Sequence, residues 1–307
     1  MVIVSAMGKM TNQLELLVDH YFTKPSHVGA SIIQVYDFHY QISSDLFKNT
    51  SHPIFNLLIK YKNELQFFLE SNKSNDHSFV YDQVVSYGEL ISTSIISSYL
   101  SYKELENNFL DVRSCIKTNT NYRDAIVDWV ETQKNILKFV PKKGICITQG
   151  FIASENTHNF STTLGREGSD YTAAIFAYCL NATSATIWKD VPGVLNADPR
   201  YFENAQLLNE ISYREAIELA FYGASVIHPK TLQPLQQKEI PFFVKSFLRP
   251  ENDGTCIGKG KRLEPLIPCF IVKKNQVLIE LSSLDFSFIV EENISEIFNL
   301  LHSYKMK

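Results

Sequence analysis

The segment 165–170, which reads GREGSD, joins two glycines to a cation, two acids and a hydroxyl, between an expected strand and an expected helix. Backbone N–H groups at the start of a helix bind anions, and glycine lets an anion approach closely. Arg166 adds a planar guanidinium that matches a carboxylate or a phosphate. The plainer alternative is a capped helix with Ser169 or Asp170 as N-cap and Arg166 in solvent. Spacing alone leaves both interpretations open.

The segment 190–200, DVPGVLNADPR, follows another expected strand. Ligands of parallel sheets bind at the carboxyl edge of the strands, where such a loop lies. Its acids and arginine suit a nucleotide with its metal ion, although an ordinary loop punctuated by Pro and Gly fits equally well. The nucleotide-binding pattern G-x-x-x-x-G-K-[ST] and the dinucleotide fingerprint G-x-G-x-x-G are absent from the sequence.

Weaker signals lie near the start of the chain and in the second half. Segment 5–12, SAMGKMTN, is typical of a strand-to-helix turn, and Glu89 follows Gly88 at an expected helix start, where an acid ordinarily favours the helix dipole. His228-Pro229 indicates a structural turn. The five cysteines form no C-x-x-C pair, and no His or Cys cluster has metal-ligand spacing.

The elements that must position these residues alternate between strands and helices, and the strands are nearly apolar throughout. This pattern predicts a largely parallel sheet with helices on both faces. The expected strands are 2–4, 110–112, 144–151, 185–188, 241–247 and 276–281. The expected helices start near 14, 56, 84, 125, 169, 210 and 294, with a polar loop from 152 through Thr163.

Composition excludes several classes of protein. The 307 residues have a formal net charge of −4 and 45% hydrophobic residues, so a sizeable core is feasible and no basic surface for nucleic acid is expected. No apolar run reaches membrane-spanning length. The odd cysteine count and the absence of a signal peptide predict a cytoplasmic protein.

Several segments in order resemble the aspartokinase branch of the amino-acid kinase family. They read VSAMG (4–8), SYGE (86–89), TQGF (148–151), TLGREGSDYTAA (163–174), WKDVPGV (188–194) with DPR (198–200), and YGASVIHP (222–229). The resemblance covers residues 1–262 and implies a three-layer αβα sandwich with a mainly parallel sheet. Residues 263–307 resemble the beginning of an ACT domain, the amino-acid-sensing module of this family.

The resemblance implies phosphorylation of the β-carboxylate of L-aspartate by ATP and Mg²⁺, the first step of lysine, threonine and methionine synthesis. It places Arg166 on the α-carboxylate, Glu89 on the α-ammonium, and Asp170 at the phosphoryl-transfer centre. Hydrogen bonds to the substrate would come from Ser5, Thr11 and Ser169. The nucleotide-contacting positions are Lys189, Asp190, Leu195, Arg200, Ser225 and Val226. A homodimer and an amino-acid effector are compatible with the resemblance.

The chemistry needs no general base. Aspartate's side-chain carboxylate has a pKa of about 3.9 in water and is a nucleophile at neutral pH. Catalysis then consists of in-line positioning and of neutralising charge on the phosphoryl group. This agrees with the absence of a His or Cys constellation.

Three departures from the family pattern keep alternatives open. The family begins with a Lys-Phe-Gly-Gly-Thr-Ser motif whose lysine contacts the ATP phosphates, and this sequence is expected to start after it. Lys189 stands where many members have Thr, and Ser225 where some have Lys. The ACT-like region is incomplete. One alternative is a non-catalytic subunit or fragment that binds an amino acid or nucleotide, and another is a kinase of glutamate, acetylglutamate or a nucleotide phosphate.

Overall fold

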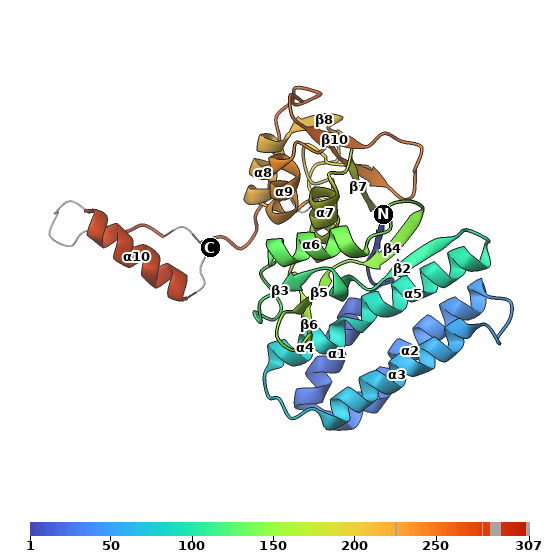
Figure 1. Ribbon diagram of the computed structural model, residues 1–307. Coiled ribbons are helices and arrows are strands. Elements are labelled where there is room, and N and C mark those ends of the chain that lie inside the picture. The colour runs from blue at the N-terminus through green and yellow to red at the C-terminus, as the bar shows by residue number, and fades with distance from the viewer. Residues whose placement is uncertain (225, 278, 283–289, 305–307) are drawn as a thin grey trace. The chain divides into compact units, whose positions relative to one another are not determined.

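The structure is a computed structural model that describes residues 1–224, 226–277, 279–282 and 290–304 (Figure 1). The chain divides into two units, Met1–Ile271 and Val272–Lys307. The strands are β1 (Val2–Val4), β2 (Asn107–Leu110), β3 (Lys117–Thr118), β4 (Ile145–Gln149), β5 (Ile152–Glu155), β6 (Ser161–Thr163), β7 (Ala185–Lys189), β8 (Glu210–Ser212), β9 (Phe242–Ser246) and β10 (Thr255–Gly258).

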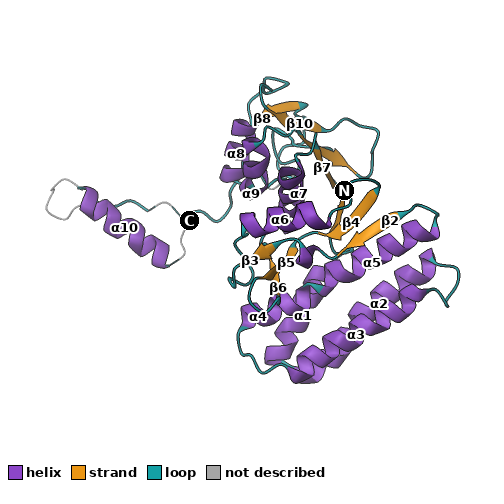
Figure 2. Ribbon diagram, viewed as in Figure 1, coloured by secondary structure: helices purple, strands orange, loops and turns teal. Residues whose placement is uncertain are grey.

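The helices are drawn in purple in Figure 2. They are α1 (Met10–Thr23), α2 (Val28–Leu46), α3 (Pro53–Ser71), α4 (His77–Val85), α5 (Tyr87–Tyr102), α6 (Trp129–Phe139), α7 (Gly168–Leu180), α8 (Tyr213–Tyr222), α9 (Pro229–Gln237) and, in the second unit, α10 (Glu291–Ser303). Single 3-10 turns, Pro25–His27 and Val112–Ser114, lie before α2 and after β2.

Most neighbouring strands run parallel. The three sheets have the strand orders β1-β4-β2, β7-β9-β10-β8 and β3-β5-β6. Only the pairs β9–β10 and β5–β6 are antiparallel among these strands. Helix α5 contacts β1, β2 and β4, whereas α7 contacts β1 and β7; Figure 1 shows α5 on one side of β2 and β4 and α6 and α7 on the other. The prediction of a three-layer α/β fold with mainly parallel strands is confirmed.

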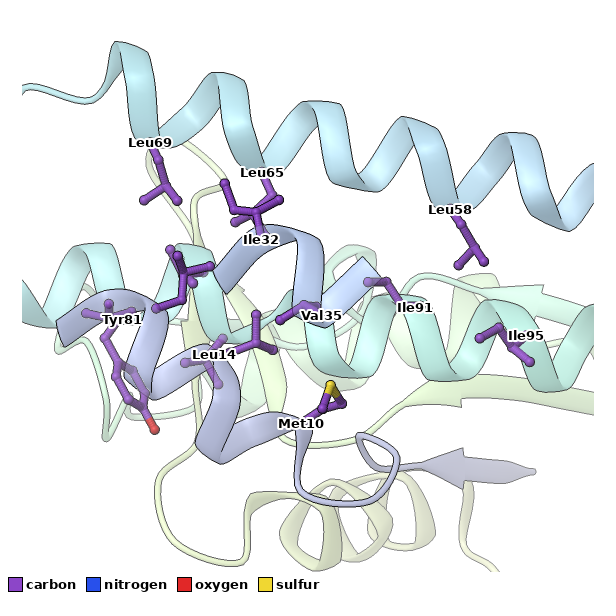
Figure 3. Packing of buried hydrophobic residues seen from close by; sticks show 14 of the residues in the cluster. Met10, Leu14, Ile32, Val35, Leu58, Leu65, Leu69, Tyr81, Ile91 and Ile95 are labelled. Carbon is purple, nitrogen blue, oxygen red and sulfur yellow. The ribbon is translucent and has the colours of Figure 1, made fainter. Parts of the chain in front are cut away.

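Helices α1 to α5 share a core of their own (Figure 3). Apolar residues at helical spacing, such as Leu58 and Leu65 on α3, lie in one core with Leu14 of α1 and Val35 of α2. Each fully buried side chain of this size contributes roughly 1.5–3 kcal/mol relative to exposure. Residues 88–95 of α5 are all buried, because helices pack on one side and a sheet on the other. The core therefore fixes the first turn of α5, in which Glu89 lies.

The prediction of a polar loop from residue 152 through Thr163 is wrong. This segment forms β5 and β6, whose polar side chains are buried. Thr163 Oγ1 donates a hydrogen bond to Asp82 Oδ1 (2.8 Å), and the hydroxyls of Thr118 and Thr162 pair at 2.8 Å. The polar side chains of these strands find their partners in distant segments. The strands therefore need no apolar alternation, which is the pattern by which strands are recognised in a sequence.

Two predicted helices begin later than expected because of their caps. The helix expected from residue 125 begins at Trp129, where the Asp128 carboxylate accepts from the N–H of Glu131 (3.1 Å). The helix expected from residue 210 begins at Tyr213, after β8, at a capping box formed by Ser212 and Glu215. The sequence patterns did not predict helices α2, α4 and α9.

The second unit contains α10, and the helix predicted near 294–304 is confirmed. The described residues of the expected strand 276–281 do not form a strand, and residue 278 lies outside the described part of the chain. Within the described residues, no helix combines the length and apolar character needed to cross a membrane.

Candidate active site

A cavity of about 540 Å³ opens where several strands end. Ser5 and Ala6 follow β1, Phe151 follows β4, and Lys189 ends β7. The carboxyl ends of parallel strands meet at one edge of the structure, which explains why segments distant in sequence converge here. The remaining lining residues are Thr11, Tyr81, Glu89, Arg123, Thr163, Gly165, Arg166, Glu167, Gly168, Ser169, Asp170 and Trp188.

Glu89 is a buried acid at the wall of this cavity, with 3% of its surface exposed. Its Oε1 accepts a hydrogen bond from the N–H of Ala6 at 3.1 Å. Its Oε2 has no hydrogen-bond partner among the residues that the structure describes. Burial raises the pKa of this carboxyl to about 8. An unpaired buried carboxylate is costly, so a cation that entered the cavity would be strongly favoured at this oxygen.

The turn 165–168 delivers Arg166 and the start of α7 to the cavity. Gly165 has φ +80°, and Glu167, at the helix N-cap position, has φ +53° and makes no side-chain cap. The N-cap part of the sequence alternative is therefore wrong, because Ser169 and Asp170 both lie inside the first turn and line the cavity. Arg166 is exposed, as that alternative expected, and it also lines the cavity.

Glycine in this region permits close packing. A Cβ on Gly165 would lie 2.7 Å from Asp124 Oδ1, and one on Gly150 would lie 2.6 Å from Ser169 Oγ. At least these two glycines are therefore required by contacts between protein segments.

Two acids and one lysine lie close together in the wall of the cavity. Lys189 Nζ lies 2.9 Å from Asp170 Oδ2 and 3.9 Å from Glu167 Oε2. Burial raises the pKa of both carboxyls, and the nearby ammonium partly opposes that shift. The three charged groups are largely shielded from solvent. Their interactions with a charged ligand are stronger in this setting than in bulk water.

The predicted substrate residues Ser5, Thr11, Glu89, Arg166 and Ser169 all line the cavity, as does the predicted catalytic residue Asp170. Their roles remain predictions.

Of the predicted nucleotide residues, only Lys189 lines the cavity among those described. Asp190 follows it directly and is exposed. Arg200 is also exposed and pairs with Asp198 at 2.6 Å. Leu195 forms an isolated antiparallel β-bridge with Leu207. Val226 lies against the core beneath α8, and Ser225 lies outside the described residues.

Sequence patterns missed several lining residues. Phe151, Thr163, Glu167 and Trp188 lie inside recognised motifs, so adjacency could have indicated them. Tyr81 and Arg123 lie in segments without a motif. Backbone geometry is the clearer signal: Arg123, Phe151 and Glu167 are three of the eight non-glycine residues with positive φ in the described chain. Such strained backbones cluster at functional sites.

No group of three or more His, Cys, Asp or Glu residues that could hold a metal ion occurs in the described part of the chain. Mg²⁺ in phosphoryl-transfer sites is commonly held by one or two carboxylates together with substrate phosphates. The buried carboxylates of Asp170 and Glu167 fit that mode of binding, with Lys189 beside them.

Comparison with known proteins identifies the class. Residues 1–246 match the model of the amino acid kinase family, and the chain belongs to this family. The lysine-sensitive aspartokinase 3 of Escherichia coli is 40% identical over 207 residues, which are 66% of this chain and 46% of that protein. The bifunctional aspartokinase/homoserine dehydrogenase of Buchnera aphidicola is 34% identical over 83% of this chain and 32% of its own length.

Solved structures agree with this assignment. The crystal structure of E. coli aspartokinase III in complex with aspartate and ADP has a TM-score of 0.78 and 33% sequence identity, over 86% of this chain and 58% of that one. The chain spans less than half the length of the two curated relatives named above.

Proposed function

We propose that this chain phosphorylates the β-carboxylate of L-aspartate with ATP, giving 4-phospho-L-aspartate. The main supporting observation is that two groups of opposite charge line one cavity: the buried carboxyl group of Glu89, with one oxygen unpartnered, and the guanidinium of Arg166. An α-amino acid offers an ammonium to the first and a carboxylate to the second. The relatives and the matched structure are aspartokinases, which supports aspartate as the amino acid.

In the proposed complex, Glu89 receives the α-ammonium and Arg166 the α-carboxylate. Hydroxyls of Ser5, Thr11 and Ser169 hydrogen-bond the substrate around them. An oxygen of the β-carboxylate then forms a bond to the γ-phosphorus as the bond to the β,γ-bridging oxygen breaks, and ADP leaves with that electron pair. The β-carboxylate is ionised at neutral pH, so no base has to remove a proton.

The nucleotide side of the proposed site begins at Lys189. Its ammonium is held by Asp170 and Glu167, so it is oriented before the phosphates arrive. Asp190, Leu195, Arg200, Ser225 and Val226 are proposed to contact the nucleotide beyond the cavity. Mg²⁺ would be held by Asp170 and Glu167 with the phosphates, and it would supply neutralisation of the transferring charge.

Further proposals concern the whole molecule. We propose a kinase domain over residues 1–262, an ACT-like region over 263–307, pairing of two copies and a cytoplasmic location. An amino-acid effector is supported by one matched structure, E. coli aspartokinase III in complex with lysine and aspartate. The boundary between compact units at Ile271 and Val272 lies close to the proposed domain boundary.

The test combines binding with turnover. Titration calorimetry should detect saturable L-aspartate binding to the 307-residue chain, weakened at least ~10-fold in Arg166→Ala. Coupled assay of ADP release with Mg-ATP should depend on L-aspartate and not on L-glutamate or N-acetylglutamate. Binding of aspartate without release would contradict the enzymatic proposal and favour a binding subunit. ADP release with one of the other acids alone would identify that acid, in place of aspartate, as the substrate.

A further inference from the structure

Arg123 lies at the rim of the cavity in a conformation that few arginines adopt. Its φ is +72°, in the left-handed region that favours glycine. The backbone N–H of Arg123 donates to both carboxylate oxygens of Asp82, at 3.1 and 3.0 Å. Asp82 is fully buried and also accepts from the N–H and hydroxyl of Thr163, at 2.9 and 2.8 Å. A buried acid and a cavity strand thus hold the turn in place.

The side chain of Arg123 is presented to the cavity by an aromatic ring. Its guanidinium carbon lies 4.3 Å from the centroid of the Tyr81 ring. Tyr81 is itself fixed, because its hydroxyl donates to Glu15 at 2.7 Å and only 8% of the residue is exposed. Both residues line the cavity. A guanidinium next to an aromatic face keeps N–H donors on its edge available for an anion.

Arg123 and Arg166 approach the cavity on two turns that touch. The Cβ position of Gly165, the residue before Arg166, is 2.7 Å from Asp124 Oδ1 and 3.4 Å from the carbonyl oxygen of Arg123. Neither guanidinium forms an ion pair with any residue in the described ranges. Of the other charged groups of the cavity, Lys189 pairs with Asp170 and lies near Glu167, whereas Glu89 accepts from Ala6 through Oε1 and has no described partner at Oε2.

We propose that Arg123 is a second carboxylate-binding residue, which binds the α-carboxylate of the acidic amino-acid substrate together with Arg166. This inference rests on the proposed function. The two turns that bear these arginines touch, and both residues line the cavity, so a carboxylate bound there could accept from both guanidinium groups through its two oxygens. The strained backbone of Arg123 is retained because it aims the side chain at this anion.

The test exploits the positive φ. Arg123→Gly removes the guanidinium while giving the turn a residue suited to its backbone. Glu104→Gly is the matched control, because Glu104 is exposed, has φ +60° and does not line the cavity. For each variant, calorimetry would give the dissociation constants of L-aspartate, of its α-amide and of Mg-ATP, and thermal unfolding would report folding.

We expect Arg123→Gly to weaken L-aspartate binding about 10-fold or more while Mg-ATP binding is unchanged. The α-amide, which lacks the α-carboxylate and keeps the β-carboxylate, should bind equally to the parent and to Arg123→Gly. Arg123→Lys should recover only part of the affinity, since it keeps the charge without the planar fork. Glu104→Gly should leave all three constants unchanged, and neither glycine variant should melt below the parent.

Several outcomes would overturn the inference. Unchanged aspartate affinity in Arg123→Gly would remove Arg123 from the substrate site while leaving the proposed function intact. Equal losses for aspartate and its α-amide would assign Arg123 to another part of the substrate, and a loss confined to Mg-ATP would assign it to the phosphates. Absence of aspartate binding in the parent chain would instead contradict the proposed function itself, and the inference with it.

Discussion

The ammonium of Lys189 lies 2.9 Å from Oδ2 of Asp170, at the end of β7 and in the first turn of α7. Glu167 approaches the same ammonium at 3.9 Å. One cation therefore balances two acids whose pKa values are raised by burial. The pair joins the β7 segment, expected to face the nucleotide, to the turn expected to face the amino acid, so its loss should affect both fold and chemistry.

Replacing Lys189 by Met should leave the two carboxylates without their cation and destabilise the fold by roughly 1–3 kcal/mol, less than for a fully buried pair. The double variant with Asp170→Asn should recover part of this loss, because it removes a charge that the single variant leaves unpaired. Urea unfolding of both single variants and the double variant measures the coupling energy. Strictly additive effects would contradict an energetic role for the pair.

The folded-state pKa of Glu89, about 8, lies above its ordinary value of 4.5. The folded chain thus holds the proton more tightly than the unfolded chain, so this contribution to stability is complete below pH 4.5 and is lost as pH rises toward 8. The local slope should approach about 1.4 kcal/mol per pH unit. Urea unfolding between pH 6 and 8, above the pKa of about 6 of the buried Asp82, should show that slope in the parent and a much smaller one in Glu89→Gln.

Aspartate binding should follow the opposite trend with pH. The ammonium needs the ionised form of Glu89, so affinity should rise as pH increases toward 8, with proton release near pH 7. Calorimetry in buffers of different ionisation enthalpy detects those protons. Glu131→Gln is the control, since Glu131 is also a first-turn glutamate but lies on α6, outside the cavity. A pH-independent affinity in the parent would rule out Glu89 as the ammonium site.

Asp82 accepts four hydrogen bonds, from Arg123 and Thr163, in a fully buried position. In Asp82→Asn, the amide NH₂ group would face the N–H and O–H donors of Arg123 and Thr163 and could not accept from them. The substitution should destabilise the fold by about 2–4 kcal/mol. Asp76→Asn is the matched control, because Asp76 is an exposed N-cap of α4 and asparagine caps helices equally well. Denaturant titration compares the two, and equal losses would argue against the buried network.

Gly150 and Gly29 should respond oppositely to alanine. A Cβ at Gly150 would lie 2.6 Å from Ser169 Oγ and 2.9 Å from Ser169 Cα, so Gly150→Ala should displace the start of α7. We expect a loss of about 1–3 kcal/mol and weaker aspartate binding. Gly29, in α2, has nothing within 4 Å of its Cβ position, and Gly29→Ala should stabilise by up to ~1 kcal/mol. Thermal unfolding with an aspartate titration checks both.

The α/β class could be predicted from sequence because apolar strands and periodic helices are local patterns. Strands 2–4 and 185–188 and helix 169–180 were predicted nearly at their bounds. By contrast, β5 and β6 are polar strands that are stable only because Asp82, Thr118 and other distant groups satisfy their side chains. No local pattern contains that information.

The sequence by itself determined the family, through ordered motifs, and therefore the segments that form the cavity. Only the tertiary structure decided which groups are buried, paired or left without a partner. It placed Glu89, which looked like an ordinary first-turn acid, beneath a core that raises its pKa, and it brought Arg123 beside the turn that bears Arg166. The reason is physical: burial and charge pairing depend on segments far apart in the chain, whereas helix and strand patterns depend on neighbours.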